Sequence, residues 1–357
     1  MRRRLFGTIL LVAVLAVSVW GVKLLWMAGA FRRISPHFAG SCHLVRGPVG
    51  PEDITIHPRT GVAYISATDR RAALAGRPLP GAIFAYDLNA SPPTLANLTP
   101  KADARFQPHG ISLWAGADGR DALFVVNHPM VGNTPDPNNI EIFDVADTGL
   151  VHRATLTDPQ LVMPNDLVAV GLDRFYVTNT HKNPPGSLQT IETYLQLSGA
   201  QVLFYGPGGF RPAIKNLVLP NGINVSPDGR TLYVASTTGR AVRFYDRDPA
   251  SETLVFRQEI PLGSGADNIE IDAHGNLWIG AHPKLLKIEA HGTDPKTLSP
   301  SQVLRVTPDG KVAEIFLDDG SVLSTSTVGA VRGRRLLIGN VYDDGFLDCE
   351  MTEEPTS

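Results

Sequence analysis

The sequence predicts an all-β protein, a six-bladed β-propeller with an N-terminal hydrophobic helix. A pattern of polar residue, alternating apolar strand, turn and second strand recurs six times along the chain. Glycine and proline account for 34 and 28 of the 357 residues, which is typical of β proteins with many turns. Helical patterns of about 10–15 residues, which a parallel α/β fold needs between its strands, are almost absent.

The first element is a long apolar segment from Leu5 to about Ala30, interrupted by Lys23. About 20 apolar residues span a bilayer, whereas secretory signal peptides have apolar cores of roughly 7–15 residues. The length favours an uncleaved signal anchor over a signal peptide cleaved near Ala28-Gly29-Ala30, and over a buried core helix. Arginines on both sides indicate the orientation only weakly: Arg2, Arg3, Arg4, Arg32 and Arg33. We assign residues 1–33 to this segment and residues 41–351 to the propeller.

The six repeats follow in order, and each begins with a polar residue: Glu52, His109, Asn165, Asn221, Asp267 and, most weakly, Ser326. Their spacings are 57, 56, 56, 46 and 59 residues, near the period of kelch-type propellers or somewhat longer. Pro227-Asp228-Gly229 and Ala273-His274-Gly275 supply residues suited to tight reversals between strands. One short amphipathic helix is predicted over residues 187–199, on a connection between blades.

Charge and cysteine content limit the possible partners and the compartment. The chain has 32 Lys+Arg against 35 Asp+Glu, so it lacks the basic bias that nucleic-acid binding needs. Cys42 and Cys349 lie near the two ends of the propeller segment. Export would favour a disulfide between them, and two unrelated buried thiols are the alternative. Asn97 and Asn224 begin tripeptides that match the glycosylation pattern, which is a weak signal.

The propeller explains why small polar residues precede buried strands. The innermost strand of each blade lines a central channel, so repeat starts far apart in the sequence converge around one axis. The converging set contains four carboxylates and three side-chain amides: Glu52, Asp53, His109, Asn165, Asp166, Asn221, Asp267 and Asn268. The alternative interpretation is that these are ordinary strand-initiating residues in a wet channel.

The composition of this set favours a calcium site. Carboxylates that lie together repel one another, and a hard cation removes that repulsion. Calcium accepts about 6–8 oxygen ligands, including carboxylates, amide carbonyls and backbone oxygens. A set without cysteine and with a single histidine argues against zinc or copper, and magnesium prefers a tighter octahedron.

Nine motifs resemble those of the paraoxonase/arylesterase family and occur in the family's order. They run from about Ser41 to Glu350: "SCHLVRGPVGPEDITI", "FQPHGISLW", "LFVVNHP", "MPNDLVAVG", "FYVTN", "LPNGINVSPDG", "ADNIEID", "LWIGAHP" and "LLIGNVYDDGFLDCE". The resemblance implies a calcium-dependent six-bladed propeller that hydrolyses lactones and aryl esters. It also implies a retained N-terminal segment that associates with lipid. We therefore expect a membrane-anchored or secreted protein whose propeller lies on the non-cytosolic side.

The resemblance also implies roles for individual residues. The calcium at the channel mouth would be held by Glu52, Asn165, Asn221, Asp267 and Asn268. A second, structural calcium would be held deeper by Asp53, Asp166 and the backbone carbonyl of Ile111. His109 and His128 would form the catalytic dyad, and Cys42 and Cys349 the disulfide that ties the first strand to the last blade.

These roles suggest a hydrolytic chemistry. Calcium would polarise the substrate carbonyl, and Asn165 and Asn221 would help to hold its oxygen. His109 would activate water as a general base, while His128 tunes it or relays its proton. No G-x-S-x-G elbow is present, which argues against an α/β-hydrolase. A strand-capping role for His109 and a purely supporting role for His128 are the alternatives.

Two other functions remain open at this stage. One is a non-catalytic, membrane-anchored propeller in which calcium only ties the blades together. The other is a gluconolactonase-type or regucalcin-type sugar lactonase with one metal, although the paired starts Glu52-Asp53 and Asn165-Asp166 favour two ions.

Some positions depart from the expected pattern or have no assigned role. Thr180 stands where the family is expected to carry aspartate, which puts the proton relay in doubt. His181 and His282 follow second strands, and their positions relative to the channel are not predicted. The remaining histidines considered are interpreted as turn or surface residues: His57, His152, His274 and His291.

Overall fold

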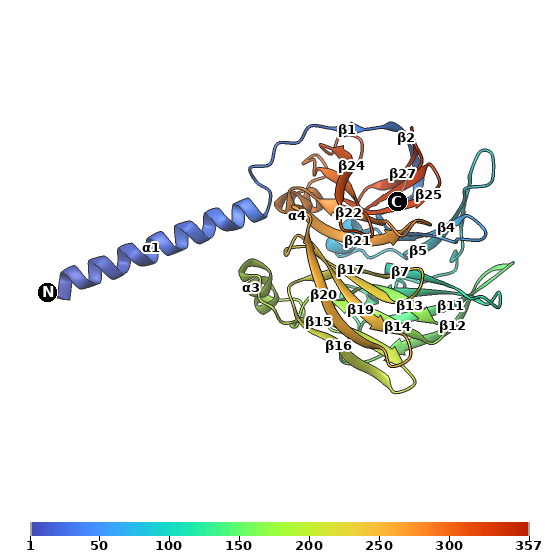
Figure 1. The fold of residues 1–357 in the computed structure, drawn as a ribbon, viewed down its shortest axis with the longest axis horizontal. Helices are drawn as coiled ribbons and strands as arrows, with labels where there is room; N and C mark the ends of the chain where they lie inside the picture. The colour runs from blue at the N-terminus through green and yellow to red at the C-terminus, as the bar shows by residue number, and fades with distance from the viewer. Residues whose placement is uncertain (1, 356–357) are drawn as a thin grey trace.

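The computed structural model describes residues 2–355, with side chains from Phe6 onward, and has the predicted architecture (Figure 1). Six antiparallel sheets surround one axis, and one of them gains a fifth strand from the N-terminal region. The innermost strands form a closed ring in which each contacts the next: β3, β7, β13, β17, β21, β25 and β3 again. The six-bladed propeller prediction is confirmed.

The first three blades each contain four strands. Blade 1 contains β3 (Pro51–Ile56), β4 (Val62–Ala67), β5 (Ala82–Asp87) and β6 (Thr94–Asn97). Blade 2 contains β7 (Pro108–Ala115), β8 (Asp121–Asn127), β11 (Asn139–Ala146) and β12 (Gly149–Thr157), and a small ribbon of β9 (Met130–Val131) and β10 (Thr134–Pro135) precedes β11. Blade 3 contains β13 (Pro164–Gly171), β14 (Arg174–Asn179), β15 (Ala200–Gly206) and β16 (Gly209–Leu217).

The last three blades follow the same plan. Blade 4 contains β17 (Pro220–Val225), β18 (Thr231–Ser236), β19 (Ala241–Asp248) and β20 (Thr253–Pro261). Blade 5 contains β21 (Gly265–Ile271), β22 (Leu277–His282), β23 (Ser301–Val306) and β24 (Val312–Asp318), with β1 (His37–Phe38) at its edge. Blade 6 contains β25 (Ser326–Arg332), β26 (Arg335–Asn340), β27 (Asp344–Met351) and β2 (Gly40–Val49).

Local sequence explains where the inner strands begin and turn. Four of the six begin with proline, which is tolerated at the first residue of a strand because that residue need not donate to the ladder. The predicted reversals occur where expected. Gly229 and Gly275 have φ values of +71° and +81°, which glycine adopts without the strain that a Cβ introduces.

The hydrophobic core is divided among the six interfaces between neighbouring blades. One cluster, for example, packs Ile54 and Ile65 of blade 1 against Leu337 and Phe346 of blade 6. Corresponding clusters occupy the other five interfaces. The core therefore surrounds the axis and leaves the channel to polar residues.

Four helices accompany the sheets. The predicted helix over residues 187–199 is present as α3 (Ser187–Leu195), but α2 (Arg70–Leu74) and α4 (Leu285–Thr293) were not predicted. All three follow the second strand of a blade. Because that strand runs antiparallel to the innermost strand, these helices lie at the face where the innermost strands begin.

The N-terminal helix α1 (Arg2–Met27) extends away from this same face (Figure 1). Its segment Phe6–Met27 has a mean hydropathy of 2.3 and is long and apolar enough to cross a membrane. The helix ends close to α4, where the backbone N–H of Leu285 donates to the carbonyl of Ala28 at 3.0 Å. The side chains of Arg2, Arg3 and Arg4, which enter the orientation argument together with Arg32 and Arg33, lie outside the described part of the chain.

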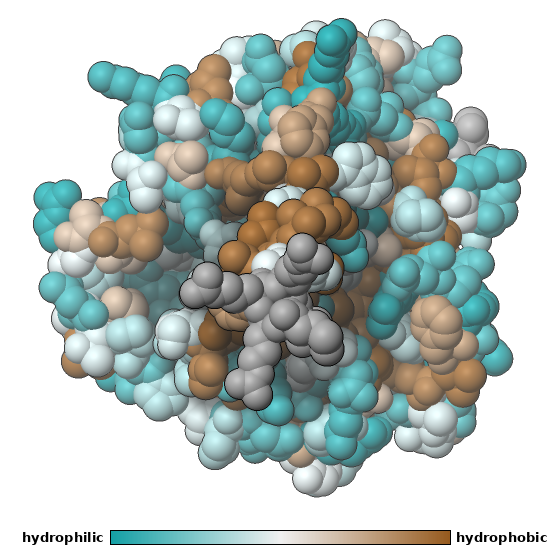
Figure 2. Space-filling view, turned by 90° about the vertical axis from the view of Figure 1, so that its left-hand side faces the viewer, coloured by the Kyte–Doolittle hydropathy of each residue, from teal (hydrophilic) through white to brown (hydrophobic). Residues whose placement is uncertain are grey.

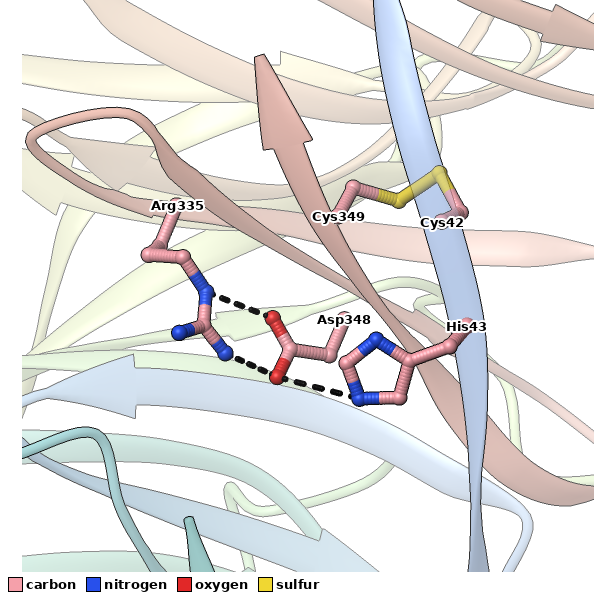
Figure 3. Close-up of a disulfide and its surroundings, with 5 residues drawn as sticks. All are labelled: Cys42, His43, Arg335, Asp348 and Cys349. Atoms are coloured by element: carbon pink, nitrogen blue, oxygen red, sulfur yellow. Dashed lines mark hydrogen bonds and ion pairs between the residues drawn. A yellow bond between two sulfur atoms is a disulfide. The ribbon is translucent and has the colours of Figure 1, made fainter. Parts of the chain in front are cut away.

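Blade 6 is closed by the N-terminal strand and by the predicted disulfide. Strand β2 pairs antiparallel with β27, which places Cys42 opposite Cys349, and their sulfurs are bonded (Figure 3). Next to the disulfide, the buried carboxylate of Asp348 pairs with Arg335, and the hydroxyl of Tyr86 in blade 1 donates to it at 2.7 Å. The disulfide prediction is confirmed, and its loop spans 307 positions.

We expect the Cys42→Ser/Cys349→Ser double variant to lose about 2–5 kcal/mol of unfolding free energy, because the unfolded chain regains the entropy of an open loop. Urea denaturation of the full chain, followed by tryptophan fluorescence, measures this loss. Reduced wild-type protein is the matched control and should behave like the double variant. An unchanged midpoint would mean that the β2–β27 hydrogen bonds alone close the ring.

The two tripeptides of the glycosylation pattern differ in the structure. Asn97 is exposed on the outermost strand of blade 1. Asn224 is half-buried on an innermost strand, where its amide nitrogen donates to the carbonyl of Ile269 at 2.7 Å. Because that nitrogen is the atom that glycosylation modifies, only Asn97 stays a candidate.

Candidate active site

The predicted polar residues lie together at the face where the innermost strands begin. Asn268 of blade 5 donates from Nδ2 to Oε1 of Glu52 in blade 1, at 2.9 Å. The Nε2 atom of His109 in blade 2 lies 3.4 Å from the same oxygen and 3.5 Å from Nδ2 of Asn165 in blade 3. Asn221 of blade 4 donates from Nδ2 to the hydroxyl of Thr237, which donates to the carbonyl of Ala266, the residue before Asp267 in blade 5. Five blades therefore contribute to one cluster.

Backbone irregularities at the strand starts allow adjacent residues to turn toward the axis together. In a regular strand, neighbouring side chains point to opposite faces. All six innermost strands have a register shift at their first residues, for example between Pro51 and Asp53 in blade 1. Such bulges redirect side chains locally. Consequently Glu52 contacts blades 2 and 5, while Asp53 accepts a hydrogen bond from Ile111 of blade 2.

Four oxygen atoms of this cluster are buried and accept no hydrogen bond. They are Oε2 of Glu52 and the Oδ1 atoms of Asn165, Asn221 and Asn268. The three amide nitrogens, in contrast, all have partners: His109, Thr237 and Glu52, respectively. The amides are thus fixed with their oxygens unpaired. Because a buried polar atom without a partner costs about 1–3 kcal/mol, these oxygens fit a cation that accepts them all.

The electrostatics of Glu52 keep it ionised. Burial alone would raise its pKa, but His109 in its protonated form, through its charge and a hydrogen bond, together with the charge of Arg70 and a hydrogen bond from Asn268, lowers the pKa to about 2. The other mouth carboxylate, Asp267, has its pKa raised by burial, and Nε2 of the buried His282 lies 2.7 Å from its Oδ2 atom. The cluster therefore offers carboxylates and amide oxygens together. No group of three or more His, Cys, Asp or Glu suited to a metal occurs in residues 2–355.

Hydrogen bonds assign the tautomers of the two histidines. Asn138 donates from Nδ2 to the carbonyls of Leu161 and Val162, which turns its Oδ1 toward His128. His128 then donates from Nδ1 to that oxygen at 2.8 Å, and its Nε2 accepts from Nδ1 of His109 at 3.0 Å. In the neutral form of His109 the lone pair is then on Nε2, the atom that faces Glu52 and Asn165.

The pKa of His128 supports this arrangement. Burial and the neighbouring His109 lower it to about 3, so His128 is neutral near pH 7. A neutral His128 accepts the Nδ1–H of His109 and fixes the imidazole orientation. His109 is therefore arranged to take a proton at Nε2.

A second carboxylate pair lies beside the first cluster. Asp53 accepts from the N–H groups of Ile54 and Ile111, and Asp166 accepts from those of Leu167 and Ile223, at 2.7–2.9 Å. Burial raises both pKa values well above their usual range, and the charge of Asp166 raises that of Asp53 further. Two buried carboxylates that repel one another fit a dication, which would stabilise their charged forms.

The comparisons with known proteins identify the family of this chain. A model of the Arylesterase family matches residues 34–351. The chain belongs to the arylesterase family. Human serum paraoxonase/arylesterase 1 is 35% identical over 334 residues, which cover 90% of this chain and 92% of that protein. The family prediction made from the motifs is confirmed.

Solved structures with the same fold are more distant from this arylesterase-family chain. A gluconolactonase from Xanthomonas campestris has a TM-score of 0.55 at 17% identity, with 89% of this chain and 98% of that one covered. A regucalcin from Agrobacterium tumefaciens, described as a calcium-binding protein, has a TM-score of 0.51 at 16% identity, with 89% and 97% covered. At these identities the matches support the propeller fold.

In this arylesterase-family chain Thr180, where the motif resemblance predicts aspartate, contacts His181. The Thr180 hydroxyl lies 3.0 Å from Nδ1 of His181, and the Thr193 hydroxyl on α3 lies 2.9 Å from Nε2. Burial lowers the pKa of His181, and no carboxylate of the described chain lies within ion-pair distance of it. His181 is thus joined by neutral hydrogen bonds to the helix that covers this edge of the site.

Several residues that organise the site were not predicted. Asn138 orients His128, Thr237 orients Asn221, and His282 contacts Asp267. Glu270 on β21 adds a further carboxylate, whose pKa burial raises to about 8. The repeat alignment held a signal for one of them, because His282 follows "LWIGA" as His128 follows "LFVVN".

Two histidine predictions were wrong. His57 and His291 were interpreted as turn or surface residues, yet each is 1% exposed. His57 lies 2.9 Å from a carboxylate oxygen of Asp121, and His291 lies 2.9 Å from one of Asp343. Both side chains fill the space beneath loops and hold blades together. His152 and His274 are exposed, as predicted.

A cavity of about 830 Å³ lies between blades 2 and 3, away from these residues. It is lined by the strand ends and turns near Trp114, Arg120, Asp173 and Tyr205. None of the predicted site residues lines it. Its walls contain no orphaned buried polar atom, so the cluster at the strand starts is the better candidate for catalysis.

Proposed function

We propose that this protein is a calcium-dependent hydrolase of lactones and aryl esters. Glu52, Asn165, Asn221, Asp267 and Asn268 would hold one calcium ion at the channel mouth. The observation that carries the proposal is the set of four buried, unpaired oxygens described above. Membership of the arylesterase family and the names of its curated relatives support the substrate class.

Calcium suits this donor set because every unpaired atom is an oxygen. Carboxylates and amide carbonyls are the ligands of hard cations, and calcium tolerates the irregular geometry that four separate blades impose. When bound, calcium supplies polarisation of the substrate carbonyl and stabilisation of the negative charge that develops on its oxygen.

The residues of the chain would manage the proton. His109 would accept a proton from water at Nε2 while its Nδ1–H stays bonded to His128 at 3.0 Å. The resulting imidazolium would be stabilised by Glu52, whose carboxylate lies 3.4 Å from Nε2. His128 would stay neutral and act as the fixed acceptor. A general base positioned in this way contributes about 10²–10⁴-fold to a rate.

Asp53, Asp166 and the backbone carbonyl of Ile111 would hold a second, structural calcium. Asp53 links blade 1 to blade 2, and Asp166 links blade 3 to blade 4, through their hydrogen bonds to Ile111 and Ile223. An ion between the two carboxylates would join these blade pairs across the axis. Its role would be to hold the ring together.

The apolar helix α1 would anchor the protein in a membrane, with the propeller on the non-cytosolic side. A disulfide between Cys42 and Cys349 fits an oxidising compartment. Figure 2 shows hydrophobic residues grouped around the base of α1, on the face that carries the site. Exposed apolar side chains of α3 lie on this face as well, among them Leu188, Ile191 and Leu195.

Hydrolysis of a γ-lactone and of phenyl acetate by the purified full chain tests the proposal. We expect turnover of both in calcium-containing buffer, complete loss with a calcium chelator, and recovery when calcium is restored. Absence of turnover over a broad lactone and ester panel, by protein with measured bound calcium, would refute the enzymatic proposal. It would favour a propeller in which calcium is only structural.

A further inference from the structure

Arg70 begins helix α2, directly after the second strand of blade 1. Hydrogen bonds fix only one edge of its guanidinium group. Nη1 donates to the carbonyls of Gly50 and Val341, at 3.3 Å each. Gly50 lies two residues before Glu52, and Val341 follows the second strand of blade 6. The guanidinium is therefore held at the seam between the first and last blades, on the face of the candidate active site.

The other edge of this guanidinium has no partner. Within residues 2–355, Nε and Nη2 of Arg70 make no hydrogen bond, and no carboxylate lies within 4.0 Å of the side chain. Arg70 is half-buried, so water compensates its charge only in part. Nε and Nη2 lie on one side of the guanidinium and present two parallel N–H groups, the geometry that matches the two oxygens of a carboxylate.

The neighbouring Arg71 shows what a structural arginine looks like here. It donates from Nη1 to Oδ1 of Asp343 and to the carbonyl of Tyr342, both at 2.9 Å, and from Nη2 to the carbonyl of His291. Its charge is paired, and it joins α2 to α4 and blade 6. The adjacent Arg70 has none of these partners, although it bears the same side chain.

Arg70 also acts electrostatically on groups from several blades. Burial lowers the pKa of Arg70, and the charges of Glu52, Tyr342 and Asp267 oppose that effect. These three residues belong to blades 1, 6 and 5. Its charge therefore reaches the channel mouth. Glu52 and Asp267 would balance the two charges of a calcium ion at the mouth, so the positive charge of Arg70 would stay uncompensated there and favour an anionic group beside it.

We propose that Arg70 binds a carboxylate carried by the substrate at a distance from the scissile carbonyl. The preferred substrates would then be lactones or esters that bear a pendant carboxylate. The inference rests on the proposed hydrolase function, and it narrows the substrate class. Arg70 is a specificity-determining residue in this proposal, since the proton transfer at His109 does not involve it.

The test uses the calcium-loaded full chain and two matched lactones, one with a pendant carboxylate and one with the corresponding carboxamide. We expect wild-type protein to prefer the carboxylate lactone by about tenfold to a hundredfold in kcat/KM, through KM, as for a charge-assisted hydrogen bond. Arg70→Gln should remove this preference, and Arg70→Lys should keep part of it. The matched control Arg71→Gln should keep the preference and lower the melting temperature.

A binding measurement separates this inference from the hydrolase proposal. Calorimetry with the lactam analogues, in which a ring amide replaces the ring ester, reports the same contact without turnover. Tighter binding of the carboxylate lactam to wild type than to Arg70→Gln supports the inference. Equal affinity of wild type for both lactams would overturn it. So would an equal fall in kcat/KM for both lactones in Arg70→Gln, because Arg70 would then act on the reaction centre or on the fold. If neither lactone is turned over, the hydrolase proposal fails and calorimetry alone decides on Arg70.

Discussion

Replacing His109 with glutamine is expected to lower kcat/KM for a lactone by about 10²–10⁴-fold, while the protein stays folded and binds calcium. Glutamine preserves much of the side-chain volume and a donor toward His128, but it has no basic nitrogen at the position of Nε2. The effect should fall on kcat, because the loss concerns proton transfer and not substrate binding. Steady-state kinetics with a γ-lactone, together with thermal unfolding, measures both parts of the expectation.

The control variants for this experiment come from the same histidine set. His152→Gln changes an exposed histidine on the outer strand of blade 2 and should leave kcat unchanged. Asn138→Leu removes the acceptor that fixes the tautomer of His128, so it should lower kcat by less than His109→Gln does. Activity of His109→Gln within a few-fold of wild type would show that another group takes the proton.

The sequence predicted the parts of this molecule that repeat. The polar residue or pair and the first two strands of each blade recur with similar length, so their alignment revealed six blades and placed Glu52, Asn221 and Asp267 on one axis. The outer strands carry no comparable pattern, since their exposed faces tolerate many residues. Helix α2 spans only 5 residues, too few for a periodic apolar stripe to stand out, and α4 has the same 9-residue length as α3 but contains Gly292, which disfavours helix.

The partners of the site residues were harder to predict because they obey no repeat. Asn138 lies in the irregular loop before β11, and its role depends on carbonyls of blade 3 that fold beside it. Arg70 and Arg71 are adjacent and identical in type. Only the three-dimensional arrangement shows that one is paired with Asp343 and the other is not. Burial of His57 likewise follows from a loop packing that no local pattern encodes.

Removal of calcium is expected to abolish activity and to destabilise the propeller. The loss of activity should come from the ion at the channel mouth, and most of the loss of stability from the ion held by Asp53 and Asp166. At free calcium 100-fold above its dissociation constant, each ion adds about 2.7 kcal/mol to the unfolding free energy. Calorimetric melting with and without chelator measures the sum.

Because burial raises the pKa values of Asp53 and Asp166, lower pH protonates these carboxylates in the calcium-free state and weakens calcium binding. The destabilisation by chelator should therefore shrink as the pH falls.

Substitution within the two ligand sets assigns the effects to individual ions. Asp53→Asn should reduce bound calcium from two ions to one per chain and lower the melting temperature, because Asp53 is a proposed ligand of the structural calcium. Asn221→Ala removes a mouth oxygen without changing charge, so it should weaken the other ion and reduce turnover with a smaller loss of stability. Asp173→Asn, at a carboxylate that is 84% exposed in a blade 3 turn, is the control for loss of a negative charge. Elemental analysis of each variant counts the ions. If Asp53→Asn keeps two ions at full occupancy, the second site is not where these carboxylates lie, and their mutual repulsion must be relieved by a shared proton instead.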